Sequence, residues 1–223
     1  MVNSTPENAA PAAPTREDHD AIPAFRYRSV TAWLIGINVA IFVLDALLKH
    51  RLYQWGAFTR ESAAMHLQVW RWVTYQFLHA HLLHLGLNML GLYIFGPVME
   101  KWWGGRRFLG FYLLCGMSGA WLFSVLAYLN VISAGVGQPL IGASGSVYGI
   151  LMGCALVAGD VQVLLLFPPM PIKVRTLVIV AVLIALASIL LKWRNAGSEA
   201  AHLGGALLGF FLVKRAGAAD KSG

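Results

Sequence analysis

The apolar residues of this chain are gathered into blocks that are long enough to cross a lipid bilayer. Crossing roughly 30 Å of hydrocarbon as a helix takes at least about 17 predominantly apolar residues. Five blocks meet that length, at residues 30–48, 82–99, 108–129, 144–167 and 172–191. Of the 223 residues, 58% are hydrophobic and only 12% are charged, whereas a soluble domain usually carries about a quarter charged residues. The sequence therefore predicts a helical membrane protein.

A sixth apolar block, residues 200–213, is shorter and rich in glycine, so hydropathy alone leaves it undecided. Counting it, we expect an all-α membrane protein, a bundle of six transmembrane helices over residues 29–214. Residues 1–28 are polar and rich in Pro and Ala, which predicts a disordered cytoplasmic tail, and residues 215–223 are expected to form a second one. We expect no signal peptide, because the first apolar run begins only at Val30 and lacks a small-residue cleavage pattern.

The positive charges orient this predicted bundle. With the N-terminus inside, eleven of the 17 Lys and Arg residues fall on inner segments and six on outer segments, as the positive-inside rule expects. Six spans then return the C-terminus to the cytoplasm. The net charge of +7 is thus explained by topology, and we expect no nucleic-acid partner.

Both cysteines, Cys115 and Cys154, fall inside predicted spans. We interpret them as small apolar residues and expect no disulfide between them.

The predicted topology brings the polar residues of three spans to one depth. Spans two, four and six all run from outside to inside, so each begins near the outer face. The polar residues at these beginnings are His79, His81, His84, Asn88, Ser144 and His202. A serine and a histidine at one depth are the parts of a nucleophile and its base.

Helical spacing predicts which of these residues meet. Ser144 and Tyr148 are four apart and share a helix face. Small residues at every fourth position form two stripes, Gly145-Gly149-Gly153 and Gly205-Gly209. Such stripes let helices approach closely in lipid, so spans four and six can pack with Ser144 facing His202. Glycine stripes usually serve packing alone, and a serine often bonds its own backbone, but a histidine buried in lipid indicates function.

The histidines at the start of span two also raise the question of a metal site. His81 and His84 are three residues apart, and imidazoles suit zinc or copper. However, no carboxylate or cysteine lies nearby in the sequence, and His79 and His84 fall on different sides of a regular helix. We expect no metal and no other cofactor.

These residues match the motifs of a known family. Over residues 29–214 the chain resembles the rhomboid intramembrane serine proteases, in their six-span bacterial form. Each short motif is only modestly specific, but the set in this order is highly specific. The matching elements are Trp70-Arg71, His79-x4-His84-x3-Asn88, Gly96-x3-Glu100-x3-Gly104, Gly142-Ala143-Ser144-Gly145-x3-Gly149 and Ala201-His202-x2-Gly205-x3-Gly209.

The resemblance implies a catalytic pair without a third member. Ser144 would attack the scissile carbonyl, with His202 as general base and then general acid. No Asp or Glu is expected at this depth to orient the base. The oxyanion would be bound by the Ser144 backbone N–H and by the side chains of His84 and Asn88.

The remaining family positions are expected to support this pair. Tyr148 would pack against the histidine ring, and His79 would form structural hydrogen bonds, whereas His81 matches no family position. Gly142, Gly145 and Gly205 complete the supporting set. Arg71 and Glu100 are expected to have structural roles, with binding of lipid headgroups as the alternative.

The sequence thus favours a serine endopeptidase that lies in the bilayer of a bacterial inner membrane and cuts transmembrane proteins near their outer ends. One alternative is a catalytically inactive rhomboid-like protein that binds membrane clients, although such proteins usually lack the serine or the histidine. The other is a small transporter, which would carry its polar residues near the bilayer midplane rather than at one end.

Overall fold

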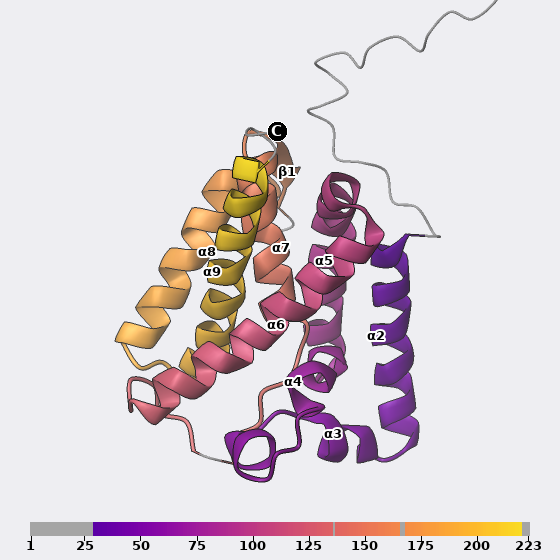
Figure 1. Ribbon diagram of the computed structural model, residues 1–223, viewed down its shortest axis with the longest axis vertical. Helices are drawn as coiled ribbons and strands as arrows, with labels where there is room; N and C mark the ends of the chain where they lie inside the picture. The colour runs from indigo at the N-terminus through magenta and orange to yellow at the C-terminus, as the bar shows by residue number, and fades with distance from the viewer. Residues whose placement is uncertain (1–28, 136, 166–167, 220–223) are drawn as a thin grey trace, which may run out of the picture.

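The computed structural model describes residues 29–135, 137–165 and 168–219 as a bundle of helices with one short two-stranded sheet (Figure 1). Successive main helices alternate in direction, so the first residues of α5, α7 and α9 lie toward the same end of the bundle (Figure 1). The main helices are α2 (Val30–Leu47), α5 (Leu82–Trp103), α6 (Gly105–Tyr128), α7 (Ser144–Val157), α8 (Val174–Leu190) and α9 (Ala196–Ala219).

Four of these helices, α2, α5, α6 and α9, are long and apolar enough to cross a membrane, and α7 and α8 are shorter apolar helices. The expected tail 1–28 lies outside the described residues, as do residues 220–223. Residues 215–219, expected to belong to the second tail, instead continue α9.

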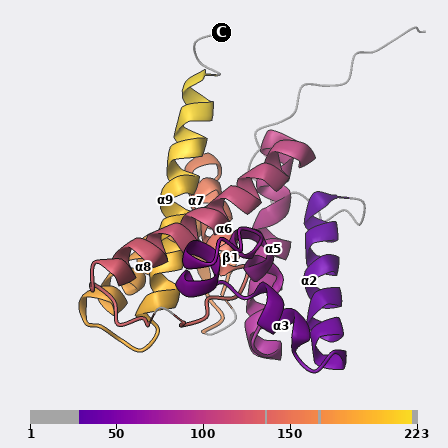
Figure 2. The same ribbon diagram turned by 60° about the horizontal axis from the view of Figure 1, so that its bottom comes forward.

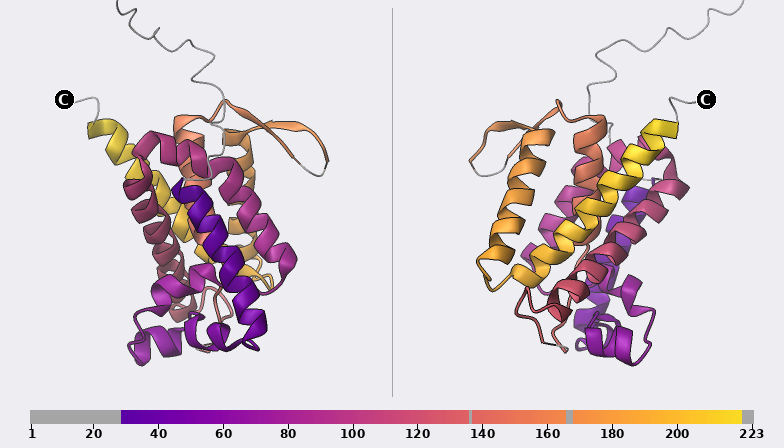
Figure 3. Two further views of the ribbon diagram at one scale, coloured as in Figure 1. Left: turned by 90° about the vertical axis from the view of Figure 1, so that its right-hand side faces the viewer. Right: turned by 60° about the vertical axis from the view of Figure 1, so that its left-hand side comes forward.

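The expected span 144–167 was too long. Helix α7 ends at Val157, and the chain then forms an antiparallel hairpin of β1 (Gln162–Leu164) and β2 (Pro171–Lys173). Asp160 lies just before this hairpin, with its carboxylate 3.4 Å from Lys173 Nζ. Charged side chains are costly in hydrocarbon, so Asp160 and Lys173 are not expected to lie within a membrane-spanning helix. The hairpin projects from the end of the bundle (Figure 3).

Helix α9, which hydropathy left undecided, is one of the two longest helices and packs between α6 and α7 (Figure 3). Its glycines make these contacts possible. A Cβ added at Gly204 would lie 2.5 Å from the carbonyl oxygen of Ser118 in α6, and one added at Gly209 would lie 2.6 Å from that of Gly149 in α7. The predicted close packing of the fourth and sixth apolar segments is confirmed.

The segment between α2 and α5 folds into short helices at the end of the bundle where α5 begins (Figure 2). Arg71 holds this segment together, because its guanidinium donates hydrogen bonds to the backbone carbonyls of Gln54 and Ala57 and to the side chain of Gln68. Its expected structural role is confirmed. The helices are α3 (Arg51–Gly56), the π-helix η1 (Glu61–Met65), α4 (Arg71–Thr74) and the 3₁₀-helix η2 (Tyr75–Phe77).

Glu100 joins the other end of α5 to the start of α2. Its carboxylate accepts hydrogen bonds from the backbone N–H groups of Val30 and Thr31, at 2.7 and 2.9 Å, and from the Thr31 hydroxyl at 2.7 Å. The first N–H groups of a helix have no partner within the helix and carry partial positive charge, so a carboxylate stabilises them. The expected structural role of Glu100 is confirmed.

Candidate active site

Ser144 is the first residue of α7, and the turn before it depends on Gly142. Gly142 has φ +114°, a conformation that residues with a side chain rarely adopt, and its N–H donates to the Tyr75 carbonyl at 2.9 Å. A Cβ added at Gly142 would lie 2.6 Å from His84 Nε2 and 3.8 Å from Ser144 Oγ. The His84 ring and the Ser144 hydroxyl therefore flank one point, which only glycine leaves open.

The Ser144 hydroxyl has no hydrogen-bond partner among the described residues. Ser144 is half-buried. Its backbone N–H lies in the first turn of α7, where N–H groups lack partners within the helix. Ser146, two residues on, differs because it is fully buried and its hydroxyl donates to Gln76 Oε1 at 3.0 Å. The structure thus separates a structural serine from an available one.

His202 of α9 lies against the same face of α7. Its ring stacks on the ring of Tyr148, with centroids 4.2 Å apart and an angle of 9° between the planes. Tyr148 follows Ser144 by four residues, about one helical turn. The expected contact between Tyr148 and the histidine is present, and it brings the imidazole within about one turn of Ser144.

A carboxylate holds His202, contrary to expectation. Glu199 Oε2 lies 2.9 Å from His202 Nδ1, and Glu199 Oε1 accepts a hydrogen bond from Asn195 Nδ2 at 2.9 Å. Glu199 was not predicted as part of the site because α9 begins at Ala196, one turn before the apolar block. The signal was the three-residue spacing, which places Glu199 and His202 on one helix face. Since a carboxylate only accepts, in the neutral ring Nδ1 carries the proton and Nε2 is left as the acceptor.

His84 and Asn88 lie one turn apart at the start of α5. The Ala80 N–H donates to His84 Nδ1 at 3.4 Å, so in the neutral ring the proton is on Nε2, the atom nearest Gly142. Asn88 is buried, and its Nδ2 donates to the His84 carbonyl at 2.8 Å. Both side chains are donors near the turn before Ser144, but their oxyanion role stays a prediction.

Of the other two histidines, only His79 departs from expectation. His81, which matched no family position, caps α5 because its Nδ1 accepts a hydrogen bond from the His84 N–H at 3.2 Å. The ring of His79 packs edge-on against His84 with centroids 5.0 Å apart. Neither His79 ring nitrogen makes a well-formed hydrogen bond to the described residues, so its expected bonding is not observed. Burial and, secondarily, the charge of His84 lower the pKa of His79 to about 4.

No set of three or more His, Cys, Asp or Glu side chains within the described part of the chain is arranged to hold a metal ion.

Two further residues that the sequence did not single out connect the η2 segment to the helices around Ser144. The hydroxyl of Tyr75 donates to the Gly116 carbonyl at 2.6 Å. Gln76 is fully buried and donates to the Leu113 carbonyl at 3.3 Å while accepting from Ser146. No periodic pattern marks them, since both lie in a short irregular segment.

The glycine contacts of α7 and α9 set the separation of Ser144 and His202. A Cβ added at Gly145 would lie 3.4 Å from the carbonyl oxygen of Ala201, the residue before the histidine. One added at Gly205 would collide with the Gly145 backbone. The supporting glycines thus lie at the closest approach of the two helices, beside the two candidate catalytic residues.

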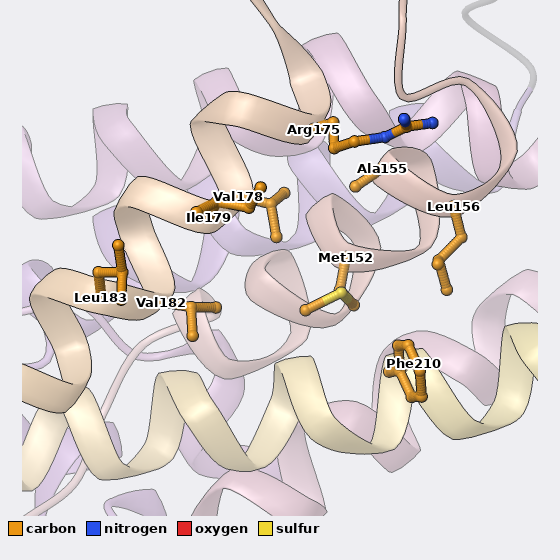
Figure 4. A pocket seen from close by; sticks show the side chains of 9 residues that line it. All are labelled: Met152, Ala155, Leu156, Arg175, Val178, Ile179, Val182, Leu183 and Phe210. Carbon is orange, nitrogen blue, oxygen red and sulfur yellow. The ribbon is translucent and has the colours of Figure 1, made fainter.

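A cavity of about 330 Å³ lies between α7, α8 and α9 (Figure 4). Neither Ser144 nor His202 lines it. Met152 lies two turns beyond Ser144, and Phe210 lies two turns beyond His202. Its lining residues are Met152, Ala155, Leu156, Arg175, Val178, Ile179, Val182, Leu183 and Phe210. Apart from Arg175 these are apolar, so the cavity offers no groups for peptide-bond chemistry.

The fold and the site define a helical membrane protein with an available serine and a carboxylate-bound histidine on adjoining helices. The rhomboid domain model matches residues 66–217, more than half of the chain, and the chain therefore belongs to the rhomboid family.

Named relatives agree with this membership. Rhomboid protein 1, mitochondrial, of Saccharomyces cerevisiae is 29% identical over 195 residues, covering 84% of this chain and 55% of the relative. RHOMBOID-like protein 6, mitochondrial, of Arabidopsis thaliana is 31% identical over 158 residues, covering 70% of this chain and 47% of the relative. Rhomboid protease GlpG of Serratia proteamaculans is 27% identical over 132 residues, covering 59% of this chain and 44% of the relative. The chain spans about half the length of these relatives.

Proposed function

We propose that this protein is an intramembrane serine endopeptidase. The observation that carries the proposal is the unbonded Ser144 hydroxyl at a helix N-terminus, with the His202 ring stacked on Tyr148 one turn away. Ser144 Oγ attacks the scissile carbonyl while His202 Nε2 takes its proton and then delivers it to the leaving amine. Water then hydrolyses the acyl-enzyme by the same proton path in reverse. A loose contact between nucleophile and base is usual before substrate binds.

Three donors are available for the oxyanion of the tetrahedral intermediate. The Ser144 N–H points out of the helix start, where the partial positive charge of α7 favours an anion. His84 Nε2–H and the Asn88 amide come from the adjoining face of α5. Donors fixed before the reaction stabilise charge as it develops, at no cost of reorganisation.

The proposed substrates are transmembrane proteins that reach the site through the bilayer. In our proposal six helices cross the membrane with both termini in the cytoplasm, so that Ser144 and His202 lie near the outer face, where substrates are cut. The asymmetry of Lys and Arg supports this orientation, and the relatives named rhomboid protease GlpG support proteolysis. We place the protein in a bacterial inner membrane; the names of two relatives make a mitochondrial membrane the alternative.

The proposal can be tested by measuring cleavage of a single-span test substrate in proteoliposomes. Ser144→Ala and His202→Ala should each abolish cleavage without unfolding, and each should cost about as much as the double variant, since such effects are strongly non-additive. A fluorophosphonate probe should label the parent but not Ser144→Ala. Ser124→Ala is the matched control, because that hydroxyl only bonds the Ala120 carbonyl of its own helix. An inactive client-binding protein would bind the substrate without cutting it and would not be labelled by the probe. That result would overturn the proposal.

A further inference from the structure

We propose that Glu199 is a positioning residue that fixes the tautomer and orientation of His202, so that the proposed protease works with a carboxylate behind its base. This inference rests on the proposed function. Glu199 Oε2 lies 2.9 Å from His202 Nδ1. This contact is made by the ring nitrogen that would not take the serine proton, and it leaves Nε2 free. A carboxylate in this place selects the Nδ1–H tautomer, the only neutral form whose Nε2 can accept the serine proton.

Glu199 is itself held in place. Its second oxygen accepts from Asn195 Nδ2 at 2.9 Å, and it lies in the first turn of α9, where the helix stabilises negative charge. Tyr148 covers the face of the His202 ring. Both the position and the rotation of the imidazole are thus determined, by a stacked ring on one side and a fixed carboxylate on another.

Burial makes this contact stronger than the other histidine–carboxylate contact in the described part of the chain. The side chains of His202 and Glu199 are 15% and 11% exposed, whereas in the pair of His50 with Asp45, at 3.0 Å, the histidine is 71% exposed. Exposed pairs are screened by water and contribute little. The His50 pair therefore provides a matched control of similar length and atom types.

The contact with Asn195 predicts what an amide at position 199 would do. In Glu199→Gln, we expect Asn195 Nδ2 to keep its hydrogen bond to the side-chain oxygen at position 199, which turns the amide nitrogen toward His202 Nδ1. That nitrogen donates, which forces the proton of His202 onto Nε2 and removes the base. Adding Asn195→Asp reverses the arrangement, because the new carboxylate accepts from the amide nitrogen and leaves the amide oxygen to accept from His202 Nδ1–H.

Kinetics of substrate cleavage in proteoliposomes test this tautomer argument. Replacing the carboxylate of a serine protease triad by its amide lowers kcat by about 10⁴, and we expect Glu199→Gln to lower kcat by about 10²- to 10⁴-fold with KM unchanged. The double variant Glu199→Gln/Asn195→Asp should recover at least about tenfold of that loss. Asp45→Asn should leave kcat within about twofold of the parent. A Glu199→Gln enzyme with the parent's kcat, or a double variant no better than the single one, would overturn the inference.

A second measurement reports on Glu199 independently of turnover. In protein carrying ¹⁵N-labelled histidine, the His202 signals, assigned by their loss in His202→Ala, should show Nδ1–H in the parent and Nε2–H in Glu199→Gln. The same tautomer in both proteins would sink the inference even if the enzyme is active. If the parent protein cleaves no substrate, the proposed function is contradicted but the inference about Glu199 is not. The NMR signals would still show whether Glu199 sets the tautomer of His202.

Discussion

The contact between Gly205 and Gly145 makes Gly205→Ala the most demanding test of how the two catalytic helices are held. A Cβ at position 205 would lie 2.7 Å from the Gly145 carbonyl carbon and closer still to its oxygen, whereas ordinary contacts begin at 3.4 Å. The obstructing atoms are backbone, so no side chain can rotate away. We expect α9 to move from α7 by about 1 Å to restore normal contact distances.

The size of the effect follows from that displacement. Overpacking typically costs about 1–3 kcal/mol, which exceeds the gain of about 0.5–1 kcal/mol from replacing a helical glycine by alanine. Because Ser144 and His202 lie on the two helices being separated, a shift of about 1 Å should lower the cleavage rate on the order of 100-fold. We therefore predict a protein that both melts at a lower temperature and loses most of its activity.

Thermal melts in detergent and cleavage rates in proteoliposomes measure the two effects together. Gly217→Ala is the matched control in the same helix, because nothing lies within 4 Å of its added Cβ, and it should keep parental activity and stability or gain slightly in stability. Ser144→Ala should lose activity without a lower melting temperature. If Gly205→Ala melts like the parent and cleaves at the parental rate, the packing of α9 on α7 does not set the catalytic geometry.

Three predictions concern the residues around α5. Asn88→Ala should lower kcat by about 10- to 1000-fold, the range for loss of one oxyanion donor, and an unchanged kcat would exclude that role. His81→Ala should lose the α5 cap and cost about 1 kcal/mol in chemical denaturation while kcat stays within a few-fold. Since the pKa of His79 is about 4 in the folded protein against 6.5 ordinarily, the unfolded state binds more protons between these values. Stability should therefore fall as the pH drops from 6.5 to 4, and more steeply in the parent than in His79→Gln; equal slopes would contradict this.

The apolar blocks predicted where helices lie because burial in lipid selects long apolar helices. Their ends were less predictable. The block that begins at Ser144 stays largely apolar through β1, interrupted by Asp160 and Gln162, whereas the helix itself ends at Val157 and β1 pairs with β2. A strand and a helix of similar composition cannot be separated by hydropathy over so few residues.

Three polar residues whose contacts were not predicted from the sequence share a location: Glu199, His81 and Asn195 all lie at helix starts, outside the apolar blocks. This has a physical cause. The first N–H groups of a helix need polar partners, so helix starts gather polar side chains that hydropathy assigns to loops. The same unpaired N–H groups stabilise an oxyanion at Ser144, and the same partial charge stabilises the carboxylate of Glu199. The nucleophile Ser144, the carboxylate of Glu199 and the α5 cap His81 therefore occupy equivalent places at the starts of three helices. Extending each apolar block by one turn toward its N-terminus would have brought Glu199 into the predicted site.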